Sequence, residues 1–257
     1  MSASAPRVSR GGALITGAAR RIGRALALKA QAAGYDVAVH TRHADPDADA
    51  LTVSLKAVGG HAAVVTGDLS IDTELETLAQ RAGAAVGPLT LLVNCASLFE
   101  DDRIQTLTAA GWDAHMRANF RAPVLLSQAF AAQLPEGRDG LIVNIIDQRV
   151  LRPTPQFFSY ALSKAGLWDA TRMMAQALAP RIRVNGIGPG PTLASIHQSP
   201  EDFAAEIAGL PLQRGSSPDE IAGALAYLID APTVTGQMIA VDGGQHLAWK
   251  TPDIIDP

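Results

Sequence analysis

Short apolar runs that alternate with helix-like segments constrain the fold of this chain more than any other feature. The runs lack polar alternation, so each predicts a strand covered on both faces of a sheet. Strands that alternate with helices indicate right-handed crossovers and a parallel, doubly wound sheet. The predicted strands are residues 13–16, 37–40, 62–66, 89–94, 141–146, 183–185 and 238–241. The predicted helices include residues 22–33, 73–83, 112–133, 158–178 and 218–229.

The length of 257 residues suits a single α/β domain. The proline-rich pieces 152–155 and 189–191 are too short to separate domains, and no repeat or low-complexity linker is present. We therefore expect one Rossmann-like domain over residues 11–247, with a doubly wound parallel sheet of about seven strands. A flexible N-terminus (1–10) and a C-terminal tail (248–257) without an assignable role should flank it.

Composition and charge exclude several classes of protein. With 47% apolar and 18% charged residues, the chain is typical of a globular enzyme rather than a disordered one. A formal charge of −4 without a basic block predicts no binding to nucleic acid or to an anionic membrane. No apolar run is long enough for a transmembrane helix. The single Cys95 and the absence of an apolar leader in residues 1–10 favour a cytoplasmic location.

A glycine-containing turn, residues 16–23, follows the first predicted strand and runs directly into a helix. Gly17 permits a tight turn and Gly23 permits close packing of helix on strand. The free N–H groups at the start of the helix, including that of Ile22, suit a pyrophosphate. The turn therefore predicts a dinucleotide site, although glycines that merely begin a helix would look the same.

The end of the second strand predicts which dinucleotide binds. An acid here would bond the ribose of NAD, whereas cations suit the 2′-phosphate of NADP. The chain carries Arg42, with His43 as a second candidate, and Arg21 lies nearby on the glycine turn. Asp45 and Asp47 follow, which leaves a solvated loop as the alternative. We predict NADP as the cofactor and no metal.

The third and fourth predicted strands end at the same sheet edge. Asp68 can accept a hydrogen bond from the adenine amino group, and Leu69 beside it joins the predicted cofactor-binding set. Asp68 and Ser70 are also good helix caps, so capping remains the alternative. The fourth strand ends in Asn94, and small residues such as Ala96 after it would let a planar cofactor approach the backbone.

Tyr160 and Lys164 lie four residues apart, on one face of a predicted helix. A nearby ammonium favours the phenolate, which predicts a lowered tyrosine pKa suited to acid–base work. A surface pair is the alternative, but Asp147 at the preceding strand end can meet Tyr160 across one crevice, unless it only caps a helix. Asn119 is unfavourable inside a helix and could hold a water beside Lys164; a satisfied buried amide is its alternative.

The sixth predicted strand leads into a stiff loop. Pro189 and Gly190 can wall the nicotinamide, and the Thr192 hydroxyl can reach a phosphate. Residues 193–209 form a candidate lid over the substrate. Residues 242–244 are more simply explained as a structural turn.

From residue 16 to about residue 247 the chain resembles the short-chain dehydrogenase/reductase family. The matching residues, in family order, are Thr16, Gly17, Gly23, Asp68, Asn94, Cys95, Ala96, Ser97, Asn119, Tyr160, Lys164, Pro189, Gly190, Asp242, Gly243 and Gly244. Arg21 replaces the family's usual middle glycine and Asp147 its usual catalytic serine. Both departures are similar to the pteridine reductase subgroup, which includes bacterial dihydromonapterin reductases.

The resemblance implies that Phe99 stacks on a pterin opposite the nicotinamide and that Ser97 and Arg21 also contact this substrate. A loop aromatic packed into the core is the alternative for Phe99. Asp147, Tyr160, Lys164 and Asn119 would be catalytic. Hydride would pass from NADPH to a C=N carbon of a pterin or folate, with the proton from Tyr160 or from water held by Asp147. Members of the family are usually homotetramers.

Two other functions remain open. A ketone or 3-oxoacyl reductase of the same family would result if Asp147 merely stands in for serine. A catalytically idle sensor that binds NADP(H) belongs to a different class, and the intact Tyr160 and Lys164 argue against it.

Overall fold

Hydrogen bonds join seven parallel strands into one sheet in the order β3-β2-β1-β4-β5-β6-β7. The computed structural model describes residues 9–194 and 198–249, and these strands lie within that part. The strands are β1 (Gly12–Ile15), β2 (Asp36–Thr41), β3 (Ala62–Thr66), β4 (Leu89–Asn94), β5 (Gly140–Ile145), β6 (Ile182–Pro189) and β7 (Met238–Val241). The predicted Rossmann-like, doubly wound sheet is confirmed. The predicted terminal segments, 1–10 and 248–257, lie mostly outside the described residues.

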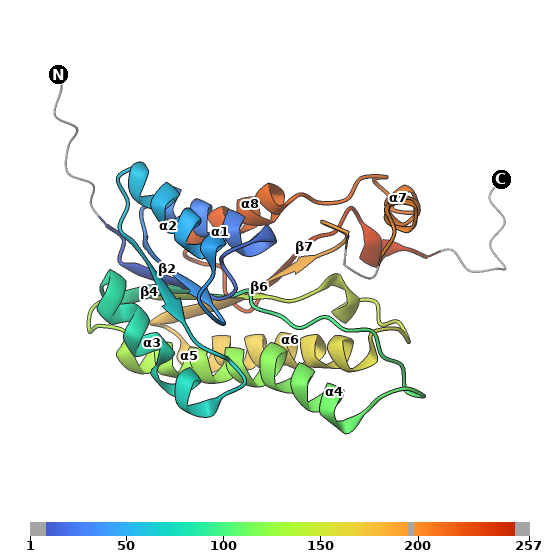
Figure 1. The fold of residues 1–257 in the computed structure, drawn as a ribbon, viewed down its shortest axis with the longest axis horizontal. Helices are drawn as coiled ribbons and strands as arrows, with labels where there is room; N and C mark the ends of the chain where they lie inside the picture. Colours follow the sequence, from blue (N-terminus) through green and yellow to red (C-terminus); the bar gives the residue numbers. More distant parts are fainter. Residues whose placement is uncertain (1–8, 195–197, 250–257) are drawn as a thin grey trace, which may run out of the picture.

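Helices cover both faces of this sheet (Figure 1). One layer holds α1 (Arg21–Ala32), α2 (Pro46–Ala57) and α8 (Pro218–Ile229). The opposite layer holds α3 (Asp72–Val86), α5 (Ala122–Gln133) and α6 (Phe158–Leu178), with α4 (Ala109–His115) packed beside α6. The short α7 (Pro200–Ala208) lies apart from both layers. Within the described residues, no helix has the length and apolar character that crossing a bilayer would require.

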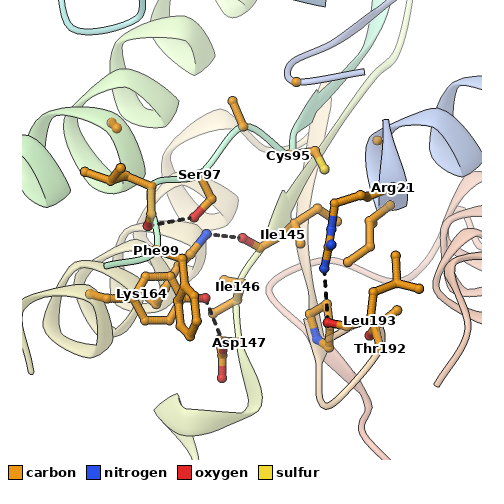
Figure 2. A pocket seen from close by; sticks show the side chains of 18 of the residues that line it. Arg21, Cys95, Ser97, Phe99, Ile145, Ile146, Asp147, Lys164, Thr192 and Leu193 are labelled. Carbon is orange, nitrogen blue, oxygen red and sulfur yellow. Dashed lines mark hydrogen bonds between the residues drawn. The ribbon is translucent and has the colours of Figure 1, made fainter. Parts of the chain in front are cut away.

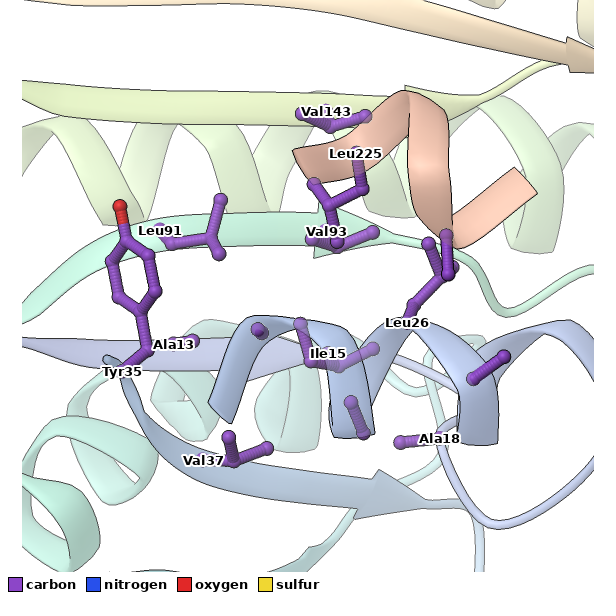
Figure 3. Packing of buried hydrophobic residues seen from close by; sticks show 14 of the residues in the cluster. Ala13, Ile15, Ala18, Leu26, Tyr35, Val37, Leu91, Val93, Val143 and Leu225 are labelled. Carbon is purple, nitrogen blue, oxygen red and sulfur yellow. The ribbon is translucent and has the colours of Figure 1, made fainter. Parts of the chain in front are cut away.

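The core between the first layer and the sheet is aliphatic (Figure 3). Leu26 of α1 and Leu225 of α8 are fully buried against Ile15, Val93 and Val143 of the central strands. Each such side chain contributes about 1.5–3 kcal/mol when it leaves water. The central strands are buried on both faces, which is why they lack polar alternation.

The predicted helix over residues 112–133 is broken, and that prediction was wrong in detail. The structure has α4, then a π-helical segment η1 (Met116–Arg121), then α5. Pro123 explains the break, because it has no N–H to donate to the carbonyl of Asn119, four residues earlier. Such π segments often occur at functional sites.

One other prediction of local structure needs correction. Residues 186–189, predicted as loop, extend β6 because they pair with β7. Residues 46–57, left unassigned from the sequence, form α2, which begins after Asp45; the Asp45 side chain accepts a hydrogen bond from the Asp47 N–H and so caps the helix. The predicted lid, residues 193–209, contains α7, and its residues 195–197 lie outside the described part.

His40 near the end of β2 connects three strand ends. Its Nδ1 accepts a hydrogen bond from the Gly17 N–H (3.2 Å), and its Nε2 lies 2.9 Å from the Gly67 carbonyl oxygen. Because Nδ1 accepts, Nε2 carries the proton and the ring is neutral. Burial lowers the pKa of His40 from 6.5 to about 4. A neutral imidazole therefore holds the glycine turn against the end of β3.

We expect replacement of His40 to change the acid stability of the protein. The unfolded chain binds the proton near pH 6.5 and the folded chain only near pH 4, so stability present above pH 6.5 is lost as the pH falls through this window. The loss attributable to His40 is about 3 kcal/mol. Urea unfolding between about pH 7 and about pH 4 should give a smaller pH dependence for His40→Gln than for the native protein. His61 is exposed, so His61→Gln is the control. If the free energy of unfolding depended equally on pH in the native protein and both variants, the low pKa of His40 would be contradicted.

Candidate active site

A pocket of about 910 Å³ opens at the carboxyl edge of the sheet, where parallel strands place their ligands. Its walls come from the segments that follow β1 to β6 and from α7. Most of the predicted site residues line it, namely Gly17, Arg21, Ile22, Gly23, Arg42, Asp68, Leu69, Ala96, Ser97, Phe99, Asp147, Tyr160, Lys164, Pro189, Gly190 and Thr192. His43, Asn94 and Asn119 do not line it.

The glycine turn has the geometry that a dinucleotide requires. Gly17 has φ +63°, and a Cβ atom there would lie 2.9 Å from Ala96 Cα. A Cβ on Gly23 would lie 2.1 Å from the Gly17 carbonyl oxygen, so α1 can pack this closely only with glycine. Arg20, the N-cap of α1, makes no side-chain capping bond. The N–H groups of the first turn therefore suit a phosphate, and the residues present fit a dinucleotide.

Arg21 occupies the position of the second glycine in an unusual backbone conformation. Its φ is +52°, which costs a residue with a Cβ about 1–2 kcal/mol. Its guanidinium donates to the carbonyl oxygens of Leu193 (3.0 Å) and Ala194 (3.2 Å), as Figure 2 shows for Leu193. Arg21 thus lies in the pocket as expected, and it binds the first residues of the predicted lid.

Arg42 and Asp68, predicted to bind different parts of the cofactor, are paired with each other. Arg42 Nε donates to Asp68 Oδ2 at 2.7 Å, while the arginine side chain stays 69% exposed. Asp45 and Asp47 bind Arg20 instead, so they do not neutralise Arg42. Because Arg42 Nη2 also lies 2.7 Å from Asp68 Oδ2, Nη1 is the guanidinium nitrogen that is left to bind a phosphate. Asp68 Oδ1 also accepts from Ser70 N–H and Oγ, a local turn rather than a helix cap.

The side chains of Asn94 and Asn119 make hydrogen bonds to other residues of the protein and do not line the pocket. Asn94 Nδ2 donates to Asn144 Oδ1 (2.8 Å) between β4 and β5. The Asn119 amide bonds Leu98 through both its oxygen (2.8 Å) and its nitrogen (2.9 Å), and it also donates to Ser163 Oγ (3.1 Å). The side chain of Asn119 is therefore the satisfied buried amide that the sequence left as an alternative, and its bonds hold the segment before Phe99.

Asp147, Tyr160 and Arg149 meet on the floor of the pocket. The Tyr160 hydroxyl donates to Asp147 Oδ2 at 2.8 Å, and Arg149 Nη1 lies 3.2 Å from the same oxygen. The second carboxylate oxygen accepts from the Arg149 N–H at 2.8 Å. Asp147 follows β5 and Tyr160 lies in the first turn of α6, so the strand end and the helix converge as their positions predicted.

Lys164 lies below Tyr160 and is 2% exposed. Its Nζ donates to the Ile145 carbonyl oxygen at 2.8 Å, and it lies 5.7 Å from the Tyr160 ring centroid. Burial lowers the pKa of Lys164 from 10.5 to about 8.

The expected lowering of the tyrosine pKa is wrong. Burial, then the charge and hydrogen bond of Asp147, raise the pKa of Tyr160 well above 10.0, against a smaller opposing effect of Arg149. A carboxylate that accepts the phenol proton stabilises the neutral phenol. Tyr160 is therefore held as a proton donor.

Two aromatic rings and a guanidinium form one wall. Phe99 stacks on Phe157 with centroids 4.3 Å apart and meets Tyr160 edge-on at 4.7 Å. The Arg149 guanidinium carbon lies 5.7 Å from the Phe99 centroid and 5.3 Å from that of Phe157. The sequence interpretation missed Arg149 and Phe157, although both are near Asp147 and Tyr160 in the chain. Phe157 has φ +53°, a strained backbone conformation that no sequence motif predicts.

The loop after β6 and the described residues of the predicted lid line the other side of the pocket. The Thr192 hydroxyl donates to the Gly190 carbonyl oxygen (3.0 Å) and lies 2.9 Å from Ser216 Oγ. Gln198, Glu206 and Gln245, also absent from the predicted set, line the pocket here, and both amides donate to the Glu206 carboxylate.

A Rossmann-like sheet with a buried tyrosine and lysine at the edge that also carries the glycine turn defines a dinucleotide-dependent oxidoreductase. A family model described as enoyl-(acyl carrier protein) reductase matches residues 17–246. The 3-oxoacyl-[acyl-carrier-protein] reductase of Synechocystis sp. is 30% identical over 238 residues, which cover 90% of this chain and 95% of that protein. An uncharacterized oxidoreductase of Methylorubrum extorquens is 35% identical over 243 residues, 90% of this chain and 96% of that protein. The chain belongs to the short-chain dehydrogenase/reductase family.

Solved structures agree with this assignment. FolM alternative dihydrofolate reductase 1 from Brucella suis, in complex with NADP, is 48% identical with a TM-score of 0.92, covering 95% of this chain and 98% of that one. A blue fluorescent protein from a metagenomic library, in complex with NADPH, is 31% identical with a TM-score of 0.86. The match covers 93% of this chain and 99% of that protein.

We expect Lys164→Met to change how stability depends on pH. The unfolded chain keeps the lysine proton up to about pH 10.4 and the folded chain only to about pH 8, so the stability of the native protein rises with pH across that window. Lys164→Met lacks this rise, and its stability relative to the native protein should fall by about 3 kcal/mol between about pH 7 and about pH 10. Urea unfolding measures the difference. The exposed Lys56 gives the control Lys56→Met, and a pH-independent difference for Lys164→Met would refute the low pKa.

Proposed function

We propose that the protein is an NADPH-dependent reductase of pterins, of the dihydropterin, dihydromonapterin or dihydrofolate type. The observation that supports this function is the buried Asp147 carboxylate bonded to the Tyr160 hydroxyl beside the Phe99 ring. Further support is the 48% sequence identity with FolM alternative dihydrofolate reductase 1 from Brucella suis.

The protein is an NADP-dependent oxidoreductase, as its family and its NADP-complexed structural relatives show. Gly17, Gly23 and the first turn of α1 would hold the pyrophosphate, and Arg42 the 2′-phosphate. When bound, the cofactor supplies the hydride.

The chain's own residues supply the proton. Tyr160 is neutral because burial and Asp147 raise its pKa, so its hydroxyl carries a proton that a ring nitrogen can take up. Asp147 orients that hydroxyl and can also hold a water that serves as donor. A pterin presents amino and ring N–H donors, and an ionised carboxylate accepts hydrogen bonds without competing to donate. A serine hydroxyl in the same place would suit a simple carbonyl.

The aromatic wall favours a flat substrate. Phe99 and Phe157 line the pocket as a stacked pair of rings, and the Arg149 guanidinium adds a planar cation beside Asp147. Flat heterocycles gain from stacking on aromatic rings and planar cations. We further expect a homotetramer, as the family resemblance implies, and a cytoplasmic location, as the single cysteine favours.

A 3-oxoacyl reductase remains the second candidate, because relatives such as the Synechocystis protein carry that name. In that case Asp147 would only replace a serine. Assays of NADPH oxidation with 7,8-dihydrobiopterin, 7,8-dihydrofolate and acetoacetyl-coenzyme A distinguish the two functions. Turnover of the thioester alone would reject the proposed function.

We expect Asp147→Ser to lower the rate with pterins about a hundredfold, because the Tyr160 hydroxyl loses its acceptor and the substrate loses a carboxylate partner. Any activity with acetoacetyl-coenzyme A should be kept or increased, which makes the same variant its own control. Steady-state kcat/KM for both substrates measures the effect. Unchanged pterin rates would remove the aspartate from the mechanism.

We expect Arg42→Ala to reduce the preference for NADPH over NADH by about 10- to 100-fold, because a charge-assisted bond to the 2′-phosphate is lost. The ratio of kcat/KM for the two cofactors measures the change. The exposed Arg117 provides the matched control Arg117→Ala, which should leave the ratio unchanged. An unaltered ratio in Arg42→Ala would show that the phosphate binds elsewhere.

A further inference from the structure

A second set of buried polar side chains lies behind the aromatic wall. His115, at the end of α4, is 1% exposed, and Ser159, one residue before Tyr160, is fully buried. His115 Nδ1 lies 2.7 Å from Ser159 Oγ, and His115 Nε2 accepts from the Glu100 N–H at 3.2 Å. The Ser159 hydroxyl donates to Asp102 Oδ2. None of these side chains was singled out by the sequence motifs.

The directions of these bonds follow from one another. The Glu100 N–H can only donate, so Nε2 of a neutral His115 must be the unprotonated nitrogen. Nδ1 then carries the proton and donates to Ser159 Oγ, which leaves the serine proton for Asp102. Burial, as the largest effect, lowers the pKa of His115, in keeping with a neutral ring. For a neutral His115, this arrangement of protons satisfies the bonds to Glu100, Ser159 and Asp102.

Asp102 also caps the helix that carries Tyr160. Helix α6 begins after Phe157, which makes no side-chain capping bond. Asp102 replaces that cap from a distant loop: its Oδ1 accepts from the Ser159 N–H (3.0 Å) and its carbonyl oxygen from the Phe158 N–H (3.1 Å). The first turn of α6 is therefore fixed by the loop that follows β4.

The same loop carries Phe99 between two anchors. Asn119 bonds both backbone groups of Leu98 on one side, and His115 accepts from the N–H of Glu100 on the other. Each anchor also reaches α6, Asn119 at Ser163 and His115 at Ser159. Two parallel connections thus join the Phe99 loop to the helix of Tyr160 and Lys164.

We propose that His115, Ser159 and Asp102 form a positioning unit for the substrate, which fixes Phe99 relative to Tyr160 through a proton arrangement set by Asp102. The unit touches neither the glycine turn nor Arg42, so it acts on substrate binding and leaves cofactor binding unaffected. This inference rests on the proposed function only for the choice of substrate.

Asp102→Asn tests the proton arrangement with almost no change of shape. The amide oxygen still accepts from the Ser159 N–H, so the cap on α6 is kept. The amide nitrogen now donates to Ser159 Oγ, whose proton must turn to His115 Nδ1. The imidazole proton then moves to Nε2, where it faces the Glu100 N–H, and two donors oppose each other beside Phe99.

We expect Asp102→Asn to raise KM for 7,8-dihydrobiopterin about tenfold, because Phe99 loses its anchor, while kcat changes less than about twofold. The Kd for NADPH should not change. Nitrogen NMR of the native protein should show the His115 proton on Nδ1, and that of Asp102→Asn should show it on Nε2. The exposed neighbour gives the control Asp101→Asn, which should match the native protein in every measurement.

His115→Phe is the second variant, which keeps the buried ring and removes both bonds. It should raise KM as Asp102→Asn does, and the double variant should be no worse than His115→Phe alone, because both changes break one unit. A native proton on Nε2, an unchanged KM in His115→Phe, or an equal weakening of NADPH binding would overturn the proposal. If the native protein reduces acetoacetyl-coenzyme A and no pterin, the proposed function fails, and KM for the thioester then decides the positioning role.

Discussion

The common direction of all seven strands is the constraint on which the rest of the structure depends. Because every strand runs the same way, each one ends at the same edge of the sheet, and the segments that follow β1 to β6 meet there. Residues as distant in sequence as Gly17 and Tyr160 line one pocket for this reason. The core residues contribute by holding the strands in register, so that side chains after neighbouring strands lie within hydrogen-bond distance.

Burial of polar groups at this edge then determines their chemical state. Lys164 is buried with the Ile145 carbonyl as its acceptor, and its pKa falls to about 8. The Tyr160 phenol is buried against a carboxylate, and its pKa rises. Burial thus makes the lysine give up its proton more readily, whereas the tyrosine retains its proton. The low local polarity that makes these groups costly to bury also separates their pKa values.

The sequence predicted the sheet, its strand positions and most of the pocket, because apolar runs and the spacing of Tyr160 and Lys164 are local patterns. It predicted less well what depends on contacts across the chain. The pairing of Arg42 with Asp68 requires that the ends of β2 and β3 lie side by side, and no local sequence pattern predicts this ion pair. Phe157 was missed because its left-handed conformation depends on Asp102, 55 residues earlier, taking over the capping of α6. The predicted direction of the Tyr160 pKa shift was wrong because burial raises this pKa most, and because the hydroxyl bonds the Asp147 carboxylate rather than Lys164.

Arg21 shows how a departure from the family pattern can be maintained against its own strain. A glycine at φ +52° would be unstrained, whereas an arginine there carries about 1–2 kcal/mol of backbone strain. The hydrogen bonds of its guanidinium to the Leu193 and Ala194 carbonyls offset part of this strain. Those bonds connect the turn that would hold the pyrophosphate to the start of the predicted lid, across the pocket that both line (Figure 2).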